Sequence, residues 1–435
     1  MQNKYSTYIF ISLALLSTIT KAQETIYPAT VQKGVTIITH ATIHIGNGTV
    51  LNDASVLFEN GKIKQVGNTI SIPSGATTID ASGKHVYPGL IIPVSSLGLK
   101  EINSGVRGSN DFLEIGDNNA SIRSIVSYNT DSKVINALRA NGVLLAHVAP
   151  MGDLIEGSSS VVQLDAWNYE DAAYKLDNGM FLNMPSLMVR RGGRGYMRPQ
   201  NGDPVKEGLA KIENVKKFFI DAKAYLQEKN HSANNLKFEA VRGLFDGKQK
   251  LFIRANEVKQ MLLAIDLGKT FGFKIVLVGA VESLQIASIL AENNIPVILD
   301  NQHALPTTED DDIDQLYKLP AQLKQAGVLF AINDANEQSK QRNISFNAGT
   351  AVAYGLDKEE ALSAITLNTA KILGIDAITG SIEVGKDANI IISEGDILDM
   401  RGNQLSKAFI QGRDISLDNK QKQLYERYKY KYKIK

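Results

Sequence analysis

The chain contains no cysteine among its 435 residues. This absence excludes disulfide bonds, thiolate metal ligands and a cysteine nucleophile, and it excludes attachment of a lipid to a cysteine near the amino terminus. The fold must therefore be held together by its hydrophobic core, and a chain of this length can bury a large one.

An excess of charge of one sign is also lacking, since 47 lysine and arginine residues stand against 46 aspartate and glutamate residues. A balanced chain has no global field that would attract a nucleic acid or an anionic membrane surface. We therefore expect no nucleic acid as partner, and no transmembrane segment once a leader has been removed.

The first 22 residues have the pattern of a secretory signal peptide. Lys4 precedes a short apolar run, residues 8–16, and the small side chain of Ala22 marks a cleavage position. The run is shorter than the roughly 17–25 apolar residues that span a bilayer. We expect an exported protein, periplasmic or secreted, with an uncleaved amino-terminal anchor as the alternative.

Both ends of the remaining chain predict short antiparallel strands. Residues 35–86 alternate apolar and polar side chains between turns, including one at Asn60-Gly61, and residues 380–416 repeat the pattern. We therefore predict a composite β-sandwich domain from residues 23–86 and 380–416. Residues 417–435 remain as a tail rich in lysine and tyrosine, which either docks on a partner or lies in solvent.

Residues 87–379 predict an α/β barrel domain. Short apolar runs such as KIVLVGA (274–280) and GVLFAIND (327–334) alternate with helical stretches, as in a parallel sheet whose strands are buried on both faces. In such a barrel the chemistry lies where the strands end. The stretch MGDLIEGSSSVV (151–162) is interpreted as a barrel loop near the pocket, because it lacks the lysine pattern of a nucleotide site.

Four motifs extend over nearly all of the chain after the leader. They are GKHVYPGLI (83–91), GVLLAHVAPMGDLIEGSSSVVQLDAWNYEDA (142–172), AYGLDKEEALSAITLNTAKILGI (353–375) and GSIEVGKDANIII (380–392). Together they resemble the amidohydrolase superfamily, and within it the secreted imidazolonepropionase-like proteins. The resemblance implies a (β/α)8 TIM-type barrel with a terminal sandwich. It also implies hydrolysis of non-peptide carbon–nitrogen bonds with one or two divalent metals.

Most of the metal ligands that this resemblance implies are missing. Family members carry Asp-x-His-x-His directly after PGLI, because residues two apart in a strand face the same way and two imidazoles can grip one ion. The corresponding residues are Ile92, Val94 and Ser96, and none replaces an imidazole. Gly279 stands where a further histidine is expected. Asp334 matches the aspartate that touches the metal and takes a proton from the attacking water.

Most of the six histidines lie where no ion is expected. His40 and His44 are four residues apart in a predicted strand, which is about 13 Å, so they cannot share an ion there. The others are His85, before the barrel, His147, expected in the core, and His231, expected in an exposed loop.

His303 is the remaining candidate. It follows the apolar run IPVILD at a predicted strand end, with Asp300 nearby. His303 and Asp334, joined by Asp300, would form either a one-metal site or a metal-free acid/base pair. The alternative is a histidine that is only hydrogen-bonded at the surface.

Residues 188–204 form an arginine- and glycine-rich stretch that holds Arg190, Arg191, Arg194 and Arg198. Guanidinium groups suit carboxylates and phosphates, so a clamp on an anionic ligand is one interpretation. The other is an insertion over the barrel mouth.

Two classes of function follow. The first is a catalytically silent or strongly altered amidohydrolase relative, which binds a small molecule in the barrel mouth, forms a homo-oligomer or pairs with an active homologue. The second is an active hydrolase of a cyclic amide, amide or dipeptide-like bond, built around Asp334 and His303. No cofactor is expected in the first case and a zinc ion in the second, because without a metal the pKa of water stays near 15.7.

Overall fold

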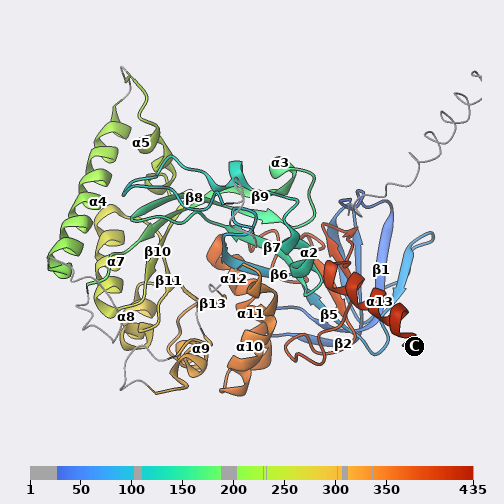
Figure 1. Ribbon diagram of the computed structural model, residues 1–435. Helices are drawn as coiled ribbons and strands as arrows, with labels where there is room; N and C mark the ends of the chain where they lie inside the picture. The colour runs from blue at the N-terminus through green and yellow to red at the C-terminus, as the bar shows by residue number, and fades with distance from the viewer. Residues whose placement is uncertain are drawn as a thin grey trace, which may run out of the picture.

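The structure is a computed structural model that describes residues 27–101, 110–187, 203–228, 230–231, 233–300, 302–305, 312–334 and 338–434. The predicted signal peptide and the four arginines of the stretch 188–204 lie outside the described residues. Figure 1 shows a strand-rich domain, built from the blue and red ends of the chain, beside a larger domain of strands and helices.

Both ends of the chain contribute to the strand-rich domain, as predicted. Its strands form one continuous sheet. The turn between β2 and β3 is Asn60-Gly61, with φ of 52° and 76°, which is the positive φ at both positions that a tight hairpin requires. In spatial order the strands are β16 (Arg413–Asp414), β15 (Leu405–Ile410), β14 (Ile390–Ser393), β5 (His85–Pro88), β1 (Val35–His44), β2 (Val50–Glu59) and β3 (Lys62–Gly67), with β4 (Thr77–Asp80) paired to β1.

The two terminal segments share one core. Ile38 and Phe58 from the amino-terminal strands are fully buried together with Ile390 and Phe409 from the carboxyl-terminal strands. The rings of Phe58 and Phe409 meet edge to face with centroids 5.2 Å apart. Neither segment could bury this apolar surface alone, so the domain needs both ends of the chain.

The larger domain is a TIM-type barrel of eight strands. Its strands pair in parallel except for β8, which is antiparallel to both neighbours. The strands are β6 (Leu90–Ser95), β7 (Val143–Val148), β8 (Ile155–Gln163), β9 (Ala173–Asn183), β10 (Lys250–Ala255), β11 (Ile275–Gly279), β12 (Val297–Leu299) and β13 (Phe330–Ile332).

The prediction of a loop at residues 151–162 was wrong, because most of this stretch is strand β8. Every residue of β8 is buried, including Ser158, Ser159 and Ser160. The serines do not make a loop because their hydroxyls find partners inside the sheet. Ser159 Oγ lies 2.7 Å from Nε2 of His147, and Ser160 Oγ accepts a hydrogen bond from the backbone of Asp177.

Helices cover the outside of the barrel (Figure 1). The sequence sets their ends locally: Asp203 caps α4, and α7 ends at Gly272, whose φ of 73° suits glycine. In the described part of the chain no helix is long and apolar enough to cross a membrane. The α-helices are α2 (Lys133–Arg139), α3 (Tyr169–Ala172), α4 (Pro204–Gln227), α5 (Leu236–Ala240), α6 (Arg242–Phe245), α7 (Val258–Phe271), α8 (Ala287–Glu292), α9 (Gln315–Gln325), α10 (Ile344–Ala353), α11 (Lys358–Ala364), α12 (Leu367–Leu373) and α13 (Lys420–Tyr432).

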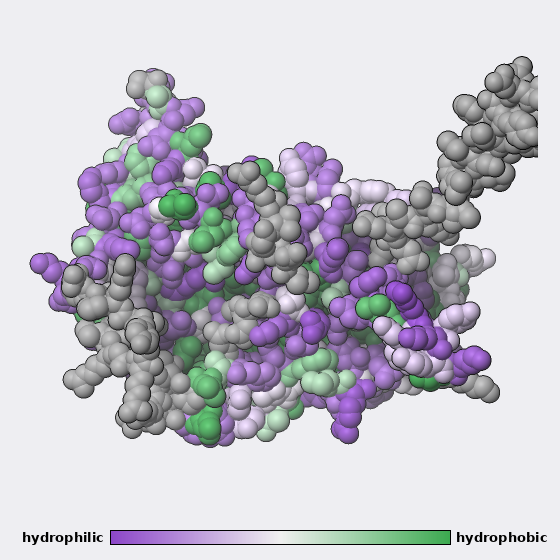
Figure 2. Space-filling model, in the orientation of Figure 1, coloured by the Kyte–Doolittle hydropathy of each residue, from purple (hydrophilic) through white to green (hydrophobic). Residues whose placement is uncertain are grey.

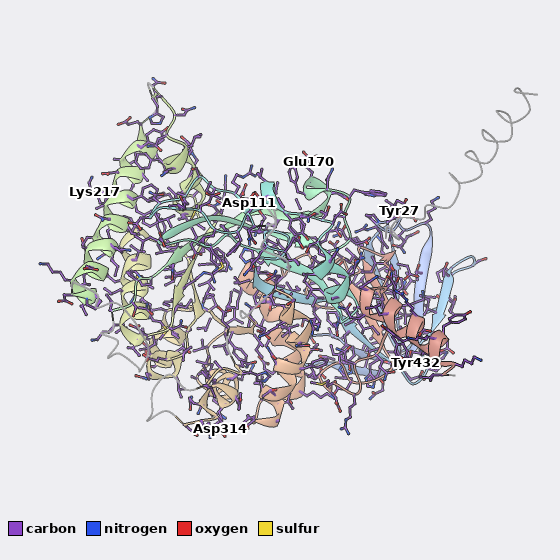
Figure 3. The ribbon with its side chains drawn as sticks, in the orientation of Figure 1. Tyr27, Asp111, Glu170, Lys217, Asp314 and Tyr432 are labelled. Atoms are coloured by element: carbon purple, nitrogen blue, oxygen red, sulfur yellow. The ribbon has the colours of Figure 1, made fainter. Side chains whose placement is uncertain are left out.

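The outer surface is mainly hydrophilic, and the apolar atoms visible in Figure 2 are scattered in small groups. Helix α13, which occupies most of the predicted tail, has no buried residue. Lys217 of α4 and Tyr432 of α13 lie at opposite ends of the molecule in Figure 3.

The barrel interior is apolar. Ile91, Phe181, Phe252 and Ile298 pack there from four different strands. Helix α12 closes one end of this interior with Ile372 and Leu373. Such a filled interior is a packed core and not a channel.

Side chains join the two ends of the barrel sheet, β13 and β6. Nδ2 of Asn333 and Nε2 of Gln341 both donate to the carbonyl oxygen of Val94, at 3.0 and 2.7 Å. Gln341 also donates to Oδ1 of Asn333 at 3.0 Å and accepts from Ser95 Oγ at 2.5 Å. We call Asn333 and Gln341 the amide clasp. Both are almost completely buried, so their hydrogen bonds cannot be replaced by water.

Replacing Gln341 by methionine should destabilise the fold. The side chain keeps its length, but the partners of its amide lose their hydrogen bonds, and each buried group left unpaired costs about 1–3 kcal/mol. We expect the free energy of unfolding in urea to fall by about 2–4 kcal/mol. The control is Gln325→Met at the exposed end of α9, which should change it by less than about 0.5 kcal/mol. Equal effects of the two substitutions would contradict a clasp.

Candidate functional site

A cavity of about 220 Å³ opens at the carboxyl ends of the barrel strands. This is the end of a TIM-type barrel where binding and chemistry are found. Its walls combine cationic, amide, hydroxyl and apolar side chains. The polar and charged residues of the wall include Ser95, Ser96, Lys100, Arg254, Asn333 and Gln341.

The residues at the expected metal positions do not face the cavity as a set. Ile92 is fully buried in the core between strands and helices, whereas Val94 belongs to the barrel interior. The pairing of β6 with β7 is irregular between Ile92 and Ser95, and a register shift there breaks the two-residue periodicity on which the expected pattern rests. Of the three expected ligand positions, Val94 and Ser96 line the cavity and Ile92 does not.

Gly279 cannot be exchanged for the expected histidine without rearrangement. Its φ is 92°, and a Cβ atom at this position would collide with Oδ1 of Asn256. The backbone here is therefore shaped for glycine.

The donor set does not fit a divalent metal of the family type. Val94 has no donor atom, Ser96 offers a neutral hydroxyl, and zinc prefers imidazole, thiolate and carboxylate ligands. Within the described ranges, no group of three or more histidine, aspartate or glutamate side chains is placed to hold an ion.

Arg254 is the principal charged group of the cavity. Strand β10 positions it near its end, and Nε donates to Oε2 of Glu156 at 3.0 Å. Its guanidinium lies over the ring of Phe181, 5.0 Å from the centroid. Glu156 is 1% exposed; burial raises its pKa and the charge of Arg254 opposes this rise. Arg254 therefore compensates a buried carboxylate while it faces the cavity.

Asp300 and Asp334 follow β12 and β13. Asp300 is buried and accepts a hydrogen bond of 2.8 Å from Nδ2 of Asn333. Burial raises the pKa of Asp300, Asp334 adds to the rise, and Arg254 with the bond from Asn333 opposes it. The two carboxylates are thus electrostatic neighbours.

His303 stands in an exposed position just beyond β12. Its Nε2 lies 2.9 Å from Oγ1 of Thr350, and its ring meets that of Tyr317 edge to face. Asp334 contacts Asn347, at 3.4 Å, on the same helix α10 that carries Thr350. Both predicted catalytic residues therefore border α10, and their catalytic role stays a prediction.

His147 is a core residue, as predicted. It is fully buried on β7, with Nδ1 2.9 Å from the carbonyl oxygen of Pro93. A carbonyl oxygen only accepts, so Nδ1 of His147 carries the proton and donates to Pro93. Nε2 then accepts a hydrogen bond from the hydroxyl of Ser159. A serine bonded to a histidine resembles a nucleophile pair, but no substrate reaches these two fully buried side chains.

The remaining histidines have structural partners. His40 is exposed and pairs with Asp53. His231 is not the exposed loop residue that we predicted, because it stacks on Tyr225 with ring centroids 3.8 Å apart. His44 bonds both Glu359 and His85, at 2.7 and 3.0 Å, where the strand-rich domain meets α11.

Sequence reasoning missed Arg254, Glu156 and the amide clasp. Arg254 directly follows the apolar residues 251–253 in the run LFIRA (251–255). A search of every strand end would therefore have found it. Glu156 was hidden in the stretch interpreted as a loop. Gln341 gave no signal, because it lies beyond β13 in a short 3-10 helix, Lys340–Asn343.

Comparison with known proteins identifies this fold. Residues 263–419 match the model of the amidohydrolase family. The crystal structure of an amidohydrolase from Thermotoga maritima superimposes with a TM-score of 0.76 at 24% identity, covering 88% of this chain and 99% of that one. The chain therefore has the amidohydrolase fold, and its carboxyl-terminal part carries the family's sequence pattern.

Similar curated proteins match over shorter segments. A dihydroorotase from Trichlorobacter lovleyi is 33% identical over 110 residues, which cover 23% of this chain and 25% of that protein. An imidazolonepropionase from Picrophilus torridus is 43% identical over 65 residues, or 15% of this chain and 16% of that protein. The chain thus spans about a quarter or less of the length of these relatives.

The buried His147 should make the protein acid-sensitive. Burial lowers its pKa to about 4, below the value of about 6.5 in an unfolded chain. The unfolded state then binds the extra proton first, so stability is complete above about pH 6.5 and is lost as the pH falls toward 4. This group alone should cost about 2 kcal/mol between pH 7.5 and pH 5.

Urea unfolding at the two pH values measures this loss. In His147→Gln, which cannot be protonated, the difference between pH 7.5 and pH 5 should shrink by about the same 2 kcal/mol. His40→Gln is the control, because His40 is exposed. An unchanged pH dependence in His147→Gln would refute the assignment.

Proposed function

We propose that this protein is an amidohydrolase relative that lacks the metal-dependent hydrolysis of its family and binds a small anionic molecule at the barrel mouth. The observation that carries the proposal is the change of side chains at the mouth. Apolar Val94 lines the cavity where a ligand histidine is expected, and Arg254 is the principal cation there. Amide hydrolysis then has no ion to activate water.

The two terminal nitrogens of Arg254, which do not bond Glu156, indicate the class of ligand. Its hydrogen bonds to Glu156 use Nε alone, and in the described part of the chain Nη1 and Nη2 form none. Two parallel N–H groups match the two oxygens of a carboxylate. Lys100, which lies over the ring of Phe112, adds a second cation to the wall. A small carboxylate with polar groups for the neighbouring amides fits this cavity best.

Further properties are proposed on sequence alone. The amino-terminal pattern of residues 1–22 supports export to the periplasm or beyond. The four motifs support a place among imidazolonepropionase-like proteins. A barrel without a metal also suits a subunit that pairs with an active homologue or forms a homo-oligomer.

The alternative is a hydrolase that uses Asp300, Asp334 and His303. The observation that favours it is the raised pKa of Asp300 beside a second carboxylate, since such pairs divide the roles of acid and base. In that case the substrate is a cyclic amide, an amide or a dipeptide-like bond, and zinc is the cofactor to seek.

Metal content separates the two functions. The protein is expressed with zinc and manganese, dialysed and analysed for bound elements. We expect far less than one ion per chain, and no turnover of small lactams, ureas or dipeptides. A retained ion together with turnover that Asp334→Asn abolishes would establish the alternative.

Ligand binding tests the role of Arg254 directly. Hippurate, which carries one carboxylate and one amide, serves as the probe in calorimetry. The double variant Arg254→Gln/Glu156→Gln removes both members of the ion pair together, so that neither is left without its direct partner. Its affinity should fall at least about tenfold, because a charge-assisted pair is lost.

The matched control is Arg242→Gln/Glu239→Gln, an arginine–glutamate pair on the surface. This control should bind hippurate as the unchanged protein does. Equal affinity in both double variants would exclude Arg254 as the ligand's partner.

A further inference from the structure

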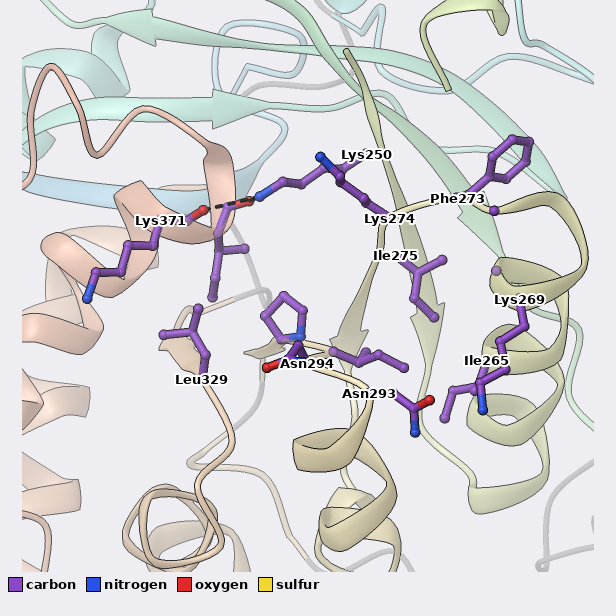
Figure 4. A pocket seen from close by; sticks show the side chains of 15 residues that line it. Lys250, Ile265, Lys269, Phe273, Lys274, Ile275, Asn293, Asn294, Leu329 and Lys371 are labelled. Carbon is purple, nitrogen blue, oxygen red and sulfur yellow. Dashed lines mark hydrogen bonds between the residues drawn. The ribbon is translucent and has the colours of Figure 1, made fainter. Parts of the chain in front are cut away.

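A second and larger cavity lies at the opposite end of the barrel. It encloses about 540 Å³ where β10, β11, β12 and β13 begin. Figure 4 shows Lys250 and Lys274 at one side of this cavity and Ile275, Asn294 and Leu329 across it. A volume of this size accommodates a small organic molecule.

Lysines dominate the charge of this cavity. Lys250, Lys269 and Lys274 line it, and Lys175 lies near enough to Lys250 to affect its pKa. Among the described residues, none of these four lysines forms an ion pair. The cluster is therefore a region of excess positive charge, with Asp376 as a nearby carboxylate. Lys371 also borders the cavity, but its side chain points away from the others in Figure 4.

Two of the lysines also have a structural role. Nζ of Lys250 donates to the carbonyl oxygens of Ile372 and Lys371, at 2.6 and 3.1 Å, and Nζ of Lys175 donates to that of Gly374 at 2.9 Å. These bonds satisfy the end of α12. Lys274 and Lys269 are exposed and form no bond of this kind to the described part of the chain, so helix capping does not account for them.

More positive than negative groups surround Lys250. Its pKa is lowered to about 8, first by burial and then by Lys175 and Lys274, while Asp376 alone opposes the change. An anion placed between Lys250 and Lys274 would stabilise the protonated form of both.

We propose that this cavity binds a phosphate monoester with an apolar body of one or two rings. The phosphate would lie against Lys250 and Lys274, since compact ammonium groups serve as point charges for phosphate. The apolar body would lie against Ile275, Pro296 and Leu329. The cavity is remote from the barrel mouth, so the ligand binds without taking part in any chemistry there.

Calorimetric titration with 1-naphthyl phosphate tests this site. We expect saturable binding, and binding at least about tenfold weaker for inorganic phosphate and for 1-naphthol, which each carry half of the recognised chemistry. Lys274→Gln should weaken binding by at least about fivefold, because an exposed cation beside the phosphate is lost. Lys259→Gln, an exposed lysine on α7 that does not line the cavity, should leave affinity unchanged.

The pH dependence identifies Lys250. Between about pH 7 and pH 9.5 the phosphate remains a dianion, so affinity should decline as the pH rises through the pKa of Lys250 and the ammonium loses its proton. In Lys250→Gln this decline should be reduced. If Lys250→Gln fails to fold, the weaker binding expected of Lys274→Gln still tests the proposal.

The proposal would be overturned if 1-naphthyl phosphate showed no saturable binding, or if Lys274→Gln and Lys259→Gln bound it with equal affinity. Binding of 1-naphthol as tight as that of 1-naphthyl phosphate would overturn it as well. The double variant Arg254→Gln/Glu156→Gln should bind 1-naphthyl phosphate normally. A loss of binding there would place the probe at the barrel mouth and also overturn this second site, without bearing on the metal content of the protein.

Discussion

The closure of the barrel between β13 and β6 is the constraint on which the mouth depends. The two strands are the ends of the described sheet, and the amide clasp joins them through the carbonyl oxygen of Val94. Asn333 also holds Asp300, so one set of hydrogen bonds fixes the edge of the barrel and a carboxylate of the site. Because all these groups are buried, losing one partner leaves others without hydrogen bonds. The geometry of the mouth is therefore tied to the stability of the barrel.

A guanidinium, that of Arg254, is the principal positive charge beside the carboxylates of the mouth. Three carboxylates lie near Arg254: Glu156 by direct contact, Asp300 through its effect on the pKa, and Asp334 as the neighbour of Asp300. Buried carboxylates need a compensating cation. Arg254 supplies it through its direct contact with Glu156 and its effect on Asp300. The arrangement of charges at the mouth is thus one cation, Arg254, beside Glu156 and Asp300.

Periodicity predicted the architecture because it reports burial. The alternation in the terminal segments and the turn at Asn60-Gly61 predicted the strands of the terminal domain, and the apolar runs predicted a barrel. The parallel pairing of β1 with β4 and β5 left no signal in this alternation. Strand β8 was missed because Gly157 and the serines that follow it have the composition of a loop, and only tertiary partners such as His147 reveal a strand. The burial of Ile92 away from the cavity could not be predicted, because a register irregularity leaves no mark in composition. The amide clasp joins residues 94 and 341, which are close only after folding.

Strand β10 links the two cavities and explains why they can differ. It begins with Lys250 in the cavity of lysines and carries Arg254 near its end at the mouth. Four residues along a strand correspond to about 13 Å between their backbone positions. The apolar interior between them holds Phe181 and Phe252, stacked with centroids 5.0 Å apart. The two cavities therefore lie at opposite ends of one strand, each with its own cations and with a packed apolar core between them.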